Sequence, residues 1–161
     1  MSKVFEVLVK KQLLDFCLAE QAIPDSQFGF LPGRSTTWQL LSVIDDWQRA
    51  LDAGHAVHAL LLDVAKAFDR VNHAILLGNC RSLGISRLSM NWIESYLSAR
   101  VIVTSVDSQL SSPQSISSGV SQGSVLGPLF FLLYFSSLPA AVQACTPMLF
   151  ADDTLVCNTS F

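Results

Sequence analysis

The sequence predicts an α/β fold in which helices pack against a sheet. Stretches with helical spacing of apolar residues alternate with short, nearly continuous apolar runs, and the last predicted element is a hairpin. Half of the 161 residues are hydrophobic and only 14% are charged, which excludes an intrinsically disordered chain. Alternating helices and strands of this kind form layers around a common core.

The first third of the chain contains two predicted helices and a loop between them. Residues 3–19 carry apolar side chains at mostly helical spacing, and residues 20–35 are rich in proline and glycine. Ser35 or Thr36 is placed to cap a second helix, which Gly54 closes. An apolar stripe on this helix is expected to face the core, and it consists of Trp38, Leu41, Ile44, Trp47 and Leu51.

Short apolar runs further along the chain predict strands. Residues 57–63 read as a strand that is buried on both faces, and residues 100–106 read as another strand. Near the end, residues 147–158 contain two short strands with a pair of aspartates between them, which predicts a β-hairpin.

Three further helices are expected in the second half. One begins near Asn72 and ends at Gly84, whose position suits a C-terminal cap, and another follows Ser86. A loop of small residues, 117–128, leads into a buried helix with Pro128 in its first turn.

Charge and cysteine content restrict the class of protein. The formal net charge is −3, so the chain has no global basic field that would attract nucleic acid. The four cysteines are scattered and include no C-x-x-C pair, which argues against a disulfide framework or a zinc site. Without a signal-peptide pattern or an apolar run of about 20 residues, we expect an intracellular, non-secreted protein, in the nucleus or the cytoplasm.

Asp152 and Asp153 are the most informative pair in the sequence, because adjacent like charges between apolar runs need compensation. Either they form a solvated turn, or a cation belongs there. Asp63 ends the predicted strand 57–63, and it either caps the next segment or presents a ligand at the end of that strand. If this strand lies beside the hairpin, three carboxylates converge and favour hard divalent cations such as Mg²⁺.

An ordered set of motifs is more specific than any one of these features. In chain order they are QFGFLPGRST (27–36), LLLDVAKAFDRVNH (60–73), SSGVSQGSVLGPLFFLLY (117–134) and FADDT (150–154). Together they resemble the reverse transcriptase domain of non-LTR (LINE-type) retrotransposons over nearly the whole chain. The resemblance implies part of a right-hand polymerase, with a partial fingers region over residues 1–55, a palm core over residues 56–161 and no thumb.

The same resemblance implies roles for the carboxylates. Asp63 matches the first catalytic aspartate of the family, and Asp152 and Asp153 match its aspartate pair. Family members bind two Mg²⁺ ions, for which Mn²⁺ is a possible substitute. They are RNA-directed DNA polymerases that add deoxynucleoside triphosphates to a DNA primer end on an RNA template.

The resemblance also implies which residues contact the substrate. Phe68 matches the aromatic residue that crowds the 2′ position of the sugar and so excludes ribonucleotides. Gln122 and Gly123 match the pair that lies along the incoming nucleotide. From its place in a loop before a helix, Arg34 is the best candidate for a phosphate or template contact.

The resemblance also implies missing parts. A thumb and the basic segment that contacts the triphosphate are not matched, so the isolated chain is expected to be weakly active or inactive. Leu31 stands where the family commonly has a basic residue, and Ser121 where it has proline. A non-catalytic fragment derived from a retrotransposon is therefore an alternative, and a metal-dependent phosphohydrolase that uses the same carboxylates is a less favoured one.

Overall fold

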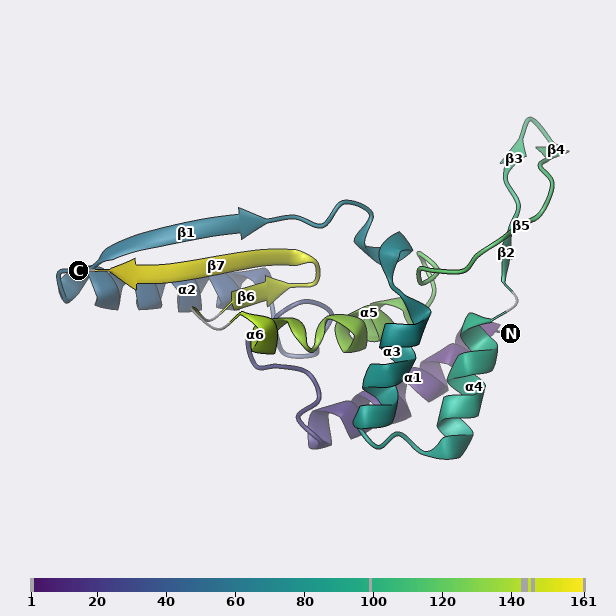
Figure 1. Ribbon diagram of the computed structural model, residues 1–161, viewed down its shortest axis with the longest axis horizontal. Coiled ribbons are helices and arrows are strands. Elements are labelled where there is room, and N and C mark those ends of the chain that lie inside the picture. The colour runs from purple at the N-terminus through teal and green to yellow at the C-terminus, as the bar shows by residue number, and fades with distance from the viewer. Residues whose placement is uncertain (1, 99, 143–144, 146, 161) are drawn as a thin grey trace.

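The computed structural model describes residues 2–98, 100–142, 145 and 147–160. Helices and strands alternate along the chain, which confirms the expected α/β class (Figure 1). The elements are α1 (Ser2–Ala19), α2 (Thr36–Asp52), β1 (Ala56–Leu62), the 3₁₀ helix η1 (Ala67–Arg70), α3 (His73–Ser82), α4 (Arg87–Leu97), β2 (Val101–Ile102), β3 (Ser105–Val106), β4 (Gln109–Leu110), β5 (Gln114–Ser115), α5 (Gly127–Phe135), α6 (Leu138–Ala141), β6 (Pro147–Phe150) and β7 (Asp153–Ser160).

The main sheet has three antiparallel strands in the order β1–β7–β6. β1 pairs with β7 along its full length, from Ala56 opposite Ser160 to Leu62 opposite Thr154. β6 and β7 form the predicted hairpin, in which Phe150 lies opposite Asp153 at the turn. The sheet therefore brings the end of β1 beside the start of β7, although the two segments are far apart in the sequence.

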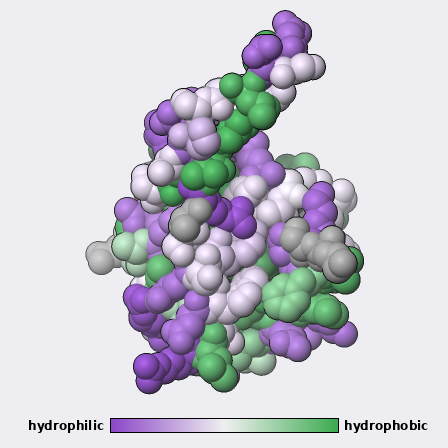
Figure 2. All heavy atoms as spheres, turned by 90° about the vertical axis from the view of Figure 1, so that its right-hand side faces the viewer, coloured by the Kyte–Doolittle hydropathy of each residue, from purple (hydrophilic) through white to green (hydrophobic). Residues whose placement is uncertain are grey.

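A narrow arm projects from the body between α4 and α5 (Figure 1). The predicted strand at residues 100–106 is interrupted here, because β2 pairs with β5 whereas β3 pairs with β4. Asp107 and Ser108 form the turn at the tip with φ angles of 48° and 65°, as a tight hairpin requires. Figure 2 shows hydrophobic residues along the arm below a hydrophilic tip.

The packed core lies among the helices α1, α3, α4 and α5. α5 is apolar on all sides, as expected for a helix surrounded by protein, and Phe130 and Phe131 are fully buried. α3 contacts both α4 and α5, and Leu76 of α3 and Ile93 of α4 belong to a buried apolar cluster to which α1 also contributes. The buried helix that the sequence predicts is thereby confirmed, with Pro128 in its first turn.

Local signals set the ends of several helices as predicted. Ser35, Asn72 and Ser86 each precede a helix, and each side chain accepts a backbone N–H from the first turn. Gly54 and Gly84 follow α2 and α3 with φ angles of +80° and +76°, a left-handed conformation that glycine adopts without strain.

The prediction that residues 57–63 are buried on both faces is wrong. Leu60, Leu61 and Leu62 are 57%, 80% and 46% exposed. β1 is an edge strand that pairs with β7 alone in the described sheet, so no strand of that sheet lies along its other edge. The apolar run reflects a buried strand only where a neighbour covers it.

The predicted core stripe of α2 is also mostly wrong. Trp38, Leu41, Ile44 and Leu51 are exposed, whereas Val43 is buried and Trp47 is half-buried. α2 contacts β1 and β6, and the indole N–H of Trp47 donates to the sulfur of Cys157 on β7. The helix is thus rotated so that part of its apolar stripe faces solvent.

Two cysteines lie inside the helical core. Burial raises the pKa of the Cys17 thiol to about 11 and that of the Cys80 thiol to about 12. Both therefore stay neutral thiols at physiological pH and act as small apolar side chains. Within the described residues, no helix has the length and hydropathy needed to cross a membrane.

Candidate active site

Strand register brings two of the predicted carboxylates to the same end of the sheet. Asp63 directly follows Leu62 and Asp153 directly precedes Thr154, and these two neighbours form the last pair of β1 and β7. Residues opposite each other in antiparallel strands project from the same face. Asp63 and Asp153 line one cavity of about 430 Å³, which is also lined by the first turns of α2.

Asp152 lies in the hairpin turn next to this cavity. The turn consists of Ala151, which is buried with a φ of +58°, and Asp152, which is half-buried. Asp152 does not line the cavity that Asp63 and Asp153 share. Among the described residues, no group of three or more His, Cys, Asp and Glu side chains is arranged to hold a metal ion. The structure thus brings Asp63 and Asp153 together with Asp152 adjacent, and it does not assemble a three-carboxylate cluster.

The three carboxylates lack compensation from protein groups. In the part of the chain that the structure describes, none of them forms a hydrogen bond or an ion pair through its side chain. Uncompensated carboxylates near one another repel, and a divalent cation relieves that repulsion. Mg²⁺ takes oxygen ligands and typically uses one or two carboxylates together with substrate phosphates. The all-oxygen donor set at this end of the sheet fits that requirement.

The hairpin turn is braced by the loop between α1 and α2. Phe28 N–H donates to the Leu149 carbonyl (2.7 Å), and Leu149 N–H donates to the Ser26 carbonyl (2.8 Å). The side chain of Gln27, 2% exposed, accepts from Ala151 N–H (2.8 Å) and donates to the Ala151 carbonyl (3.3 Å). Sequence reasoning missed Gln27, although it begins the QFGF motif.

Gly29 completes the contact between this loop and the turn. A Cβ atom at this position would lie 2.3 Å from the Ala151 nitrogen, so only glycine allows the two backbones to approach so closely. Its N–H donates to Oε1 of Gln27 (2.8 Å). This oxygen therefore accepts one hydrogen bond from Gly29 in the loop and one from Ala151 in the turn.

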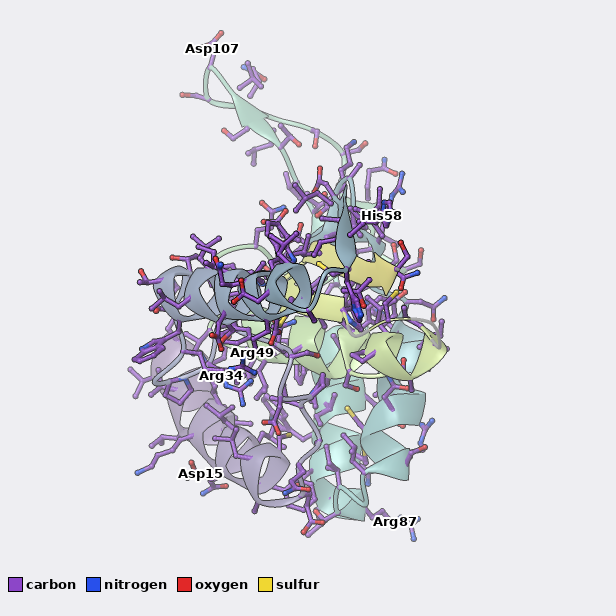
Figure 3. The ribbon with its side chains drawn as sticks, turned by 90° about the vertical axis from the view of Figure 1, so that its left-hand side faces the viewer. Asp15, Arg34, Arg49, His58, Arg87 and Asp107 are labelled. Carbon is purple, nitrogen blue, oxygen red and sulfur yellow. The ribbon has the colours of Figure 1, made fainter. Side chains whose placement is uncertain are left out.

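Arg34 is engaged within the molecule. Its guanidinium donates to the carbonyls of Asp25 and Gln27 (both 2.6 Å) and pairs with the Asp25 carboxylate at 2.9 Å. It also lies 5.7 Å from the centre of the Phe28 ring. Figure 3 shows Arg34 between α1 and α2. These bonds fasten the loop, and the contact with a phosphate or a template stays a prediction.

Phe68 is held by aromatic contacts on η1. Its ring stacks on Phe131 at 4.8 Å with an interplanar angle of 10°, and it meets Phe30 edge-on at 5.9 Å. The Phe68 carbonyl accepts the N–H of Val120 (2.9 Å), which ties η1 to the loop before α5. The ring is therefore half-buried with a fixed orientation.

The loop that carries Gln122 and Gly123 is anchored at its start. Gly119 donates to the Val71 carbonyl (2.8 Å), and a Cβ atom on Gly119 would lie 2.9 Å from the Cα of Asp69. Gln122 and Gly123 are both exposed, and Gly123 has a φ of +79°.

The structure does not place these residues in the carboxylate cavity. Gln122 lines a second cavity of about 640 Å³ together with Asp69 and the base of the arm. This cavity shares no lining residue with the one that contains Asp63 and Asp153. Gln122 thus lies in a different hollow from Asp63 and Asp153, and neither hollow is lined by Phe68 or Gly123.

Glu6 fixes the end of the same loop, and sequence reasoning missed it as well. Its buried carboxylate accepts the N–H groups of Val125 (2.9 Å) and Leu126 (3.3 Å) and the hydroxyl of Tyr96 (3.3 Å). These N–H groups lie at the N-terminus of α5, where the helix dipole favours a negative charge. A residue of α1 therefore caps α5 from outside that helix.

Comparisons with known proteins agree with this arrangement of motifs. Residues 1–160 match the family model described as reverse transcriptase (RNA-dependent DNA polymerase). The chain is 35% identical over 138 residues to a probable RNA-directed DNA polymerase from transposon X-element of Drosophila melanogaster, which covers 86% of the chain. It is 33% identical over 167 residues to the RNA-directed DNA polymerase from mobile element jockey of the same organism, covering 99% of the chain.

The match covers a small part of each relative. The chain spans 15% of the X-element protein and 18% of the jockey protein. Both relatives come from transposable elements, as the resemblance of the motifs implies, and the match extends over nearly all of the chain. The chain therefore belongs to the reverse transcriptase (RNA-dependent DNA polymerase) family.

Proposed function

We propose that the chain is the partial fingers region and the palm core of an RNA-directed DNA polymerase from a non-LTR retrotransposon. Its reaction is the addition of deoxynucleotides to a primer 3′-hydroxyl on an RNA template. The observation that supports this most strongly is the register of β1 and β7, since it places Asp63 next to Asp153 at the Asp-Asp turn of the family motif.

Asp63 and Asp152 are the proposed principal ligands of Mg²⁺, and Asp153 supports them. Asp63, Asp152 and Asp153 would hold the ions, which when bound would supply activation of the attacking hydroxyl and stabilisation of the leaving pyrophosphate. The protein groups orient these ligands: β1 and β7 fix Asp63 and Asp153 through pairing, and the braced turn fixes the backbone of Asp152. The described geometry is short of a three-ligand cluster, so in this proposal the half-buried Asp152 side chain turns towards Asp63 and Asp153 when the ions bind.

Phe68 is the proposed selector against ribonucleotides. A ring that is stacked on Phe131 cannot move away without losing that contact, so it can exclude a 2′-hydroxyl by its volume. Gln122 and Gly123 would then lie along the nucleotide that bridges the two hollows. In this proposal residues 1–55 form part of the fingers and residues 56–161 the palm.

The template and primer surfaces are proposed to lie mainly in other parts of a longer polymerase. The net charge of −3 provides little general attraction for nucleic acid. The chain also spans only 15% to 18% of the relatives named above. We therefore expect the isolated chain to show little primer extension, which is also the behaviour of the alternative, a non-catalytic fragment.

A chimeric polymerase separates these possibilities. Residues 1–160 would replace the matching segment of the jockey polymerase, and primer extension would be measured on an RNA template with Mg²⁺ and deoxynucleoside triphosphates. We expect template-dependent extension that falls by at least about 1,000-fold in an Asp152→Asn chimera, because an essential ligand of the catalytic metal is lost.

One control variant and two alternative outcomes complete this test. Asp107→Asn, at the tip of the arm (Figure 3), should leave extension unchanged. A folded chimera that hydrolyses nucleotides without template and does not extend the primer would contradict the proposal and favour the phosphohydrolase. A folded chimera without either activity would favour the non-catalytic fragment.

A further inference from the structure

We propose that Gln27 is a positioning residue for the hairpin turn that carries Asp152. The inference rests on the proposed function, in that Asp152 is taken as a metal ligand. Gln27 does not touch the reacting groups itself, and it acts through the backbone of Ala151.

The side chain of Gln27 carries both kinds of polar group that the turn requires. Oε1 of Gln27 accepts N–H groups from Ala151 and Gly29, both at 2.8 Å, while Nε2 donates to the Ala151 carbonyl at 3.3 Å. A primary amide combines a donor and an acceptor in this arrangement. A carboxylate would lack the donor, and a hydrocarbon side chain would leave buried polar groups unpaired.

The hydrogen bonds from Gln27 support an unfavourable backbone conformation at Ala151. Ala151 has a φ of +58°, a left-handed value that is unfavourable for a residue with a side chain. Its N–H and its carbonyl are both bonded to Gln27, so the strained residue is held from both sides. The Ala151 carbonyl belongs to the same planar peptide unit as the nitrogen of Asp152. Its hydrogen bond therefore fixes the orientation of the peptide plane that leads into Asp152.

Gln27 is itself held in place by hydrogen bonds of its own loop. Its carbonyl accepts from the Arg34 guanidinium at 2.6 Å, and the residues on either side of it bond to the backbone of Leu149. The side chain is 2% exposed, so water does not compete for these bonds. Because the loop is fixed, the hydrogen bonds from Gln27 also fix the turn relative to that loop.

Small displacements of the turn matter for the proposed site. A catalytic group that moves by about 1 Å can lose about 100-fold in rate, and partners that orient metal ligands typically change metal affinity by about 10- to 100-fold. Gln27 is the described side chain that bonds to both polar backbone groups of the residue before Asp152. Its removal should therefore loosen Asp152 without altering any carboxylate.

The test compares Gln27→Leu and Gln27→Glu with a matched control, Gln48→Leu, in the 161-residue chain. Gln48 is an exposed glutamine on α2 that bonds to Asp52 in the next turn. Amide hydrogen exchange of Ala151 and Gly29 would be followed by NMR, and Mn²⁺ affinity by electron paramagnetic resonance. Thermal unfolding of each variant reports on general loss of structure.

We expect the Ala151 amide of Gln27→Leu to exchange at least about 10-fold faster, because its acceptor is gone. Mn²⁺ affinity should fall by about 10-fold, the lower end of the range for residues that orient metal ligands. Gln27→Glu keeps an acceptor for Ala151 N–H, so it should retain amide protection more fully than Gln27→Leu while losing a similar share of the metal affinity. Gln48→Leu should change neither quantity.

Two results would overturn the inference in variants that fold. One is unchanged exchange of the Ala151 amide, and the other is faster exchange with unchanged Mn²⁺ affinity. If the variants do not fold, the unmodified chain decides the question. Side-chain amide protons of Gln27 that exchange as fast as those of Gln48 would contradict the inference, and slow exchange would support it.

A failure of the proposed function gives a different pattern. If Asp152→Asn binds Mn²⁺ as tightly as the unmodified chain, then Asp152 is not a ligand, whatever the exchange rates show. The hydrogen-exchange measurements depend on the bonds between Gln27 and Ala151 alone, so the two failures are distinguishable.

Discussion

The helical region and the sheet region of this chain are stabilised in different ways. The region formed by α1, α3, α4 and α5 contains most of the fully buried apolar side chains, among them Phe130 and Phe131. The region formed by α2, β1, β6 and β7 carries the carboxylates, but most of the apolar residues of β1 and of the α2 stripe are exposed. Packing therefore defines one region, whereas strand pairing and a few buried hydrogen bonds define the other.

This difference matters for the site. Asp63, Asp152 and Asp153 belong to the region with less packing, so their positions depend on strand register and on the contact of Gln27 with Ala151. Phe68 and the loop of Gln122 depend on the packed region, through Phe131 and through the contact of Glu6 with α5. Substitutions in the two regions should consequently differ in what they disturb.

The largest effect on stability is expected from Phe131→Ala. Loss of a fully buried phenylalanine typically lowers the free energy of unfolding by about 3–5 kcal/mol. Phe30 contacts Phe68 from the other side and is 45% exposed, so Phe30→Ala should cost clearly less, about 1 kcal/mol. Urea unfolding of the two variants measures the difference, and equal losses would contradict the claim that burial of Phe131 stabilises the packed region.

A smaller effect is expected from Glu6→Ala. The substitution leaves the N–H groups of Val125 and Leu126 without their acceptor, which should cost about 1–3 kcal/mol. Glu6→Gln keeps an acceptor oxygen and should recover part of the loss, whereas Glu20→Ala at an exposed position should change little. Urea unfolding again provides the measurement. A loss for Glu6→Ala no larger than that for Glu20→Ala would show that the cap does not contribute.

Local sequence patterns predicted the elements, because their causes are local. The caps at Ser35, Asn72 and Ser86, the buried helix after Pro128 and the hairpin at residues 147–158 all depend on neighbours within a few residues. The motif order also predicted the family, which the comparison with reverse transcriptases confirms. Burial of strand 57–63 was predicted wrongly because an apolar run does not show whether a neighbouring strand is present.

The sequence did not predict the contacts that hold the site. Gln27 and Ala151 are separated by 124 positions, and Glu6 and Val125 by 119. Gln27 and Glu6 are polar residues whose role depends on a partner from a distant segment, and hydropathy patterns contain no information about such pairs. The separation of the two hollows was likewise missed, because motif order does not specify how far apart the motifs lie in space.

We propose that the aspartates at the end of β1 and at the hairpin turn form one divalent-metal site. Mn²⁺ titration followed by electron paramagnetic resonance measures whether they share an ion, with Asp63→Asn, Asp152→Asn and, as a control at the tip of the arm, Asp107→Asn. Asp63→Asn and Asp152→Asn should each lower the affinity by at least about 10-fold, while Asp107→Asn leaves it unchanged, because a carboxylate ligand is lost only at the site. If Asp63→Asn binds Mn²⁺ as tightly as the unmodified chain, the two segments do not share an ion and the claim is contradicted.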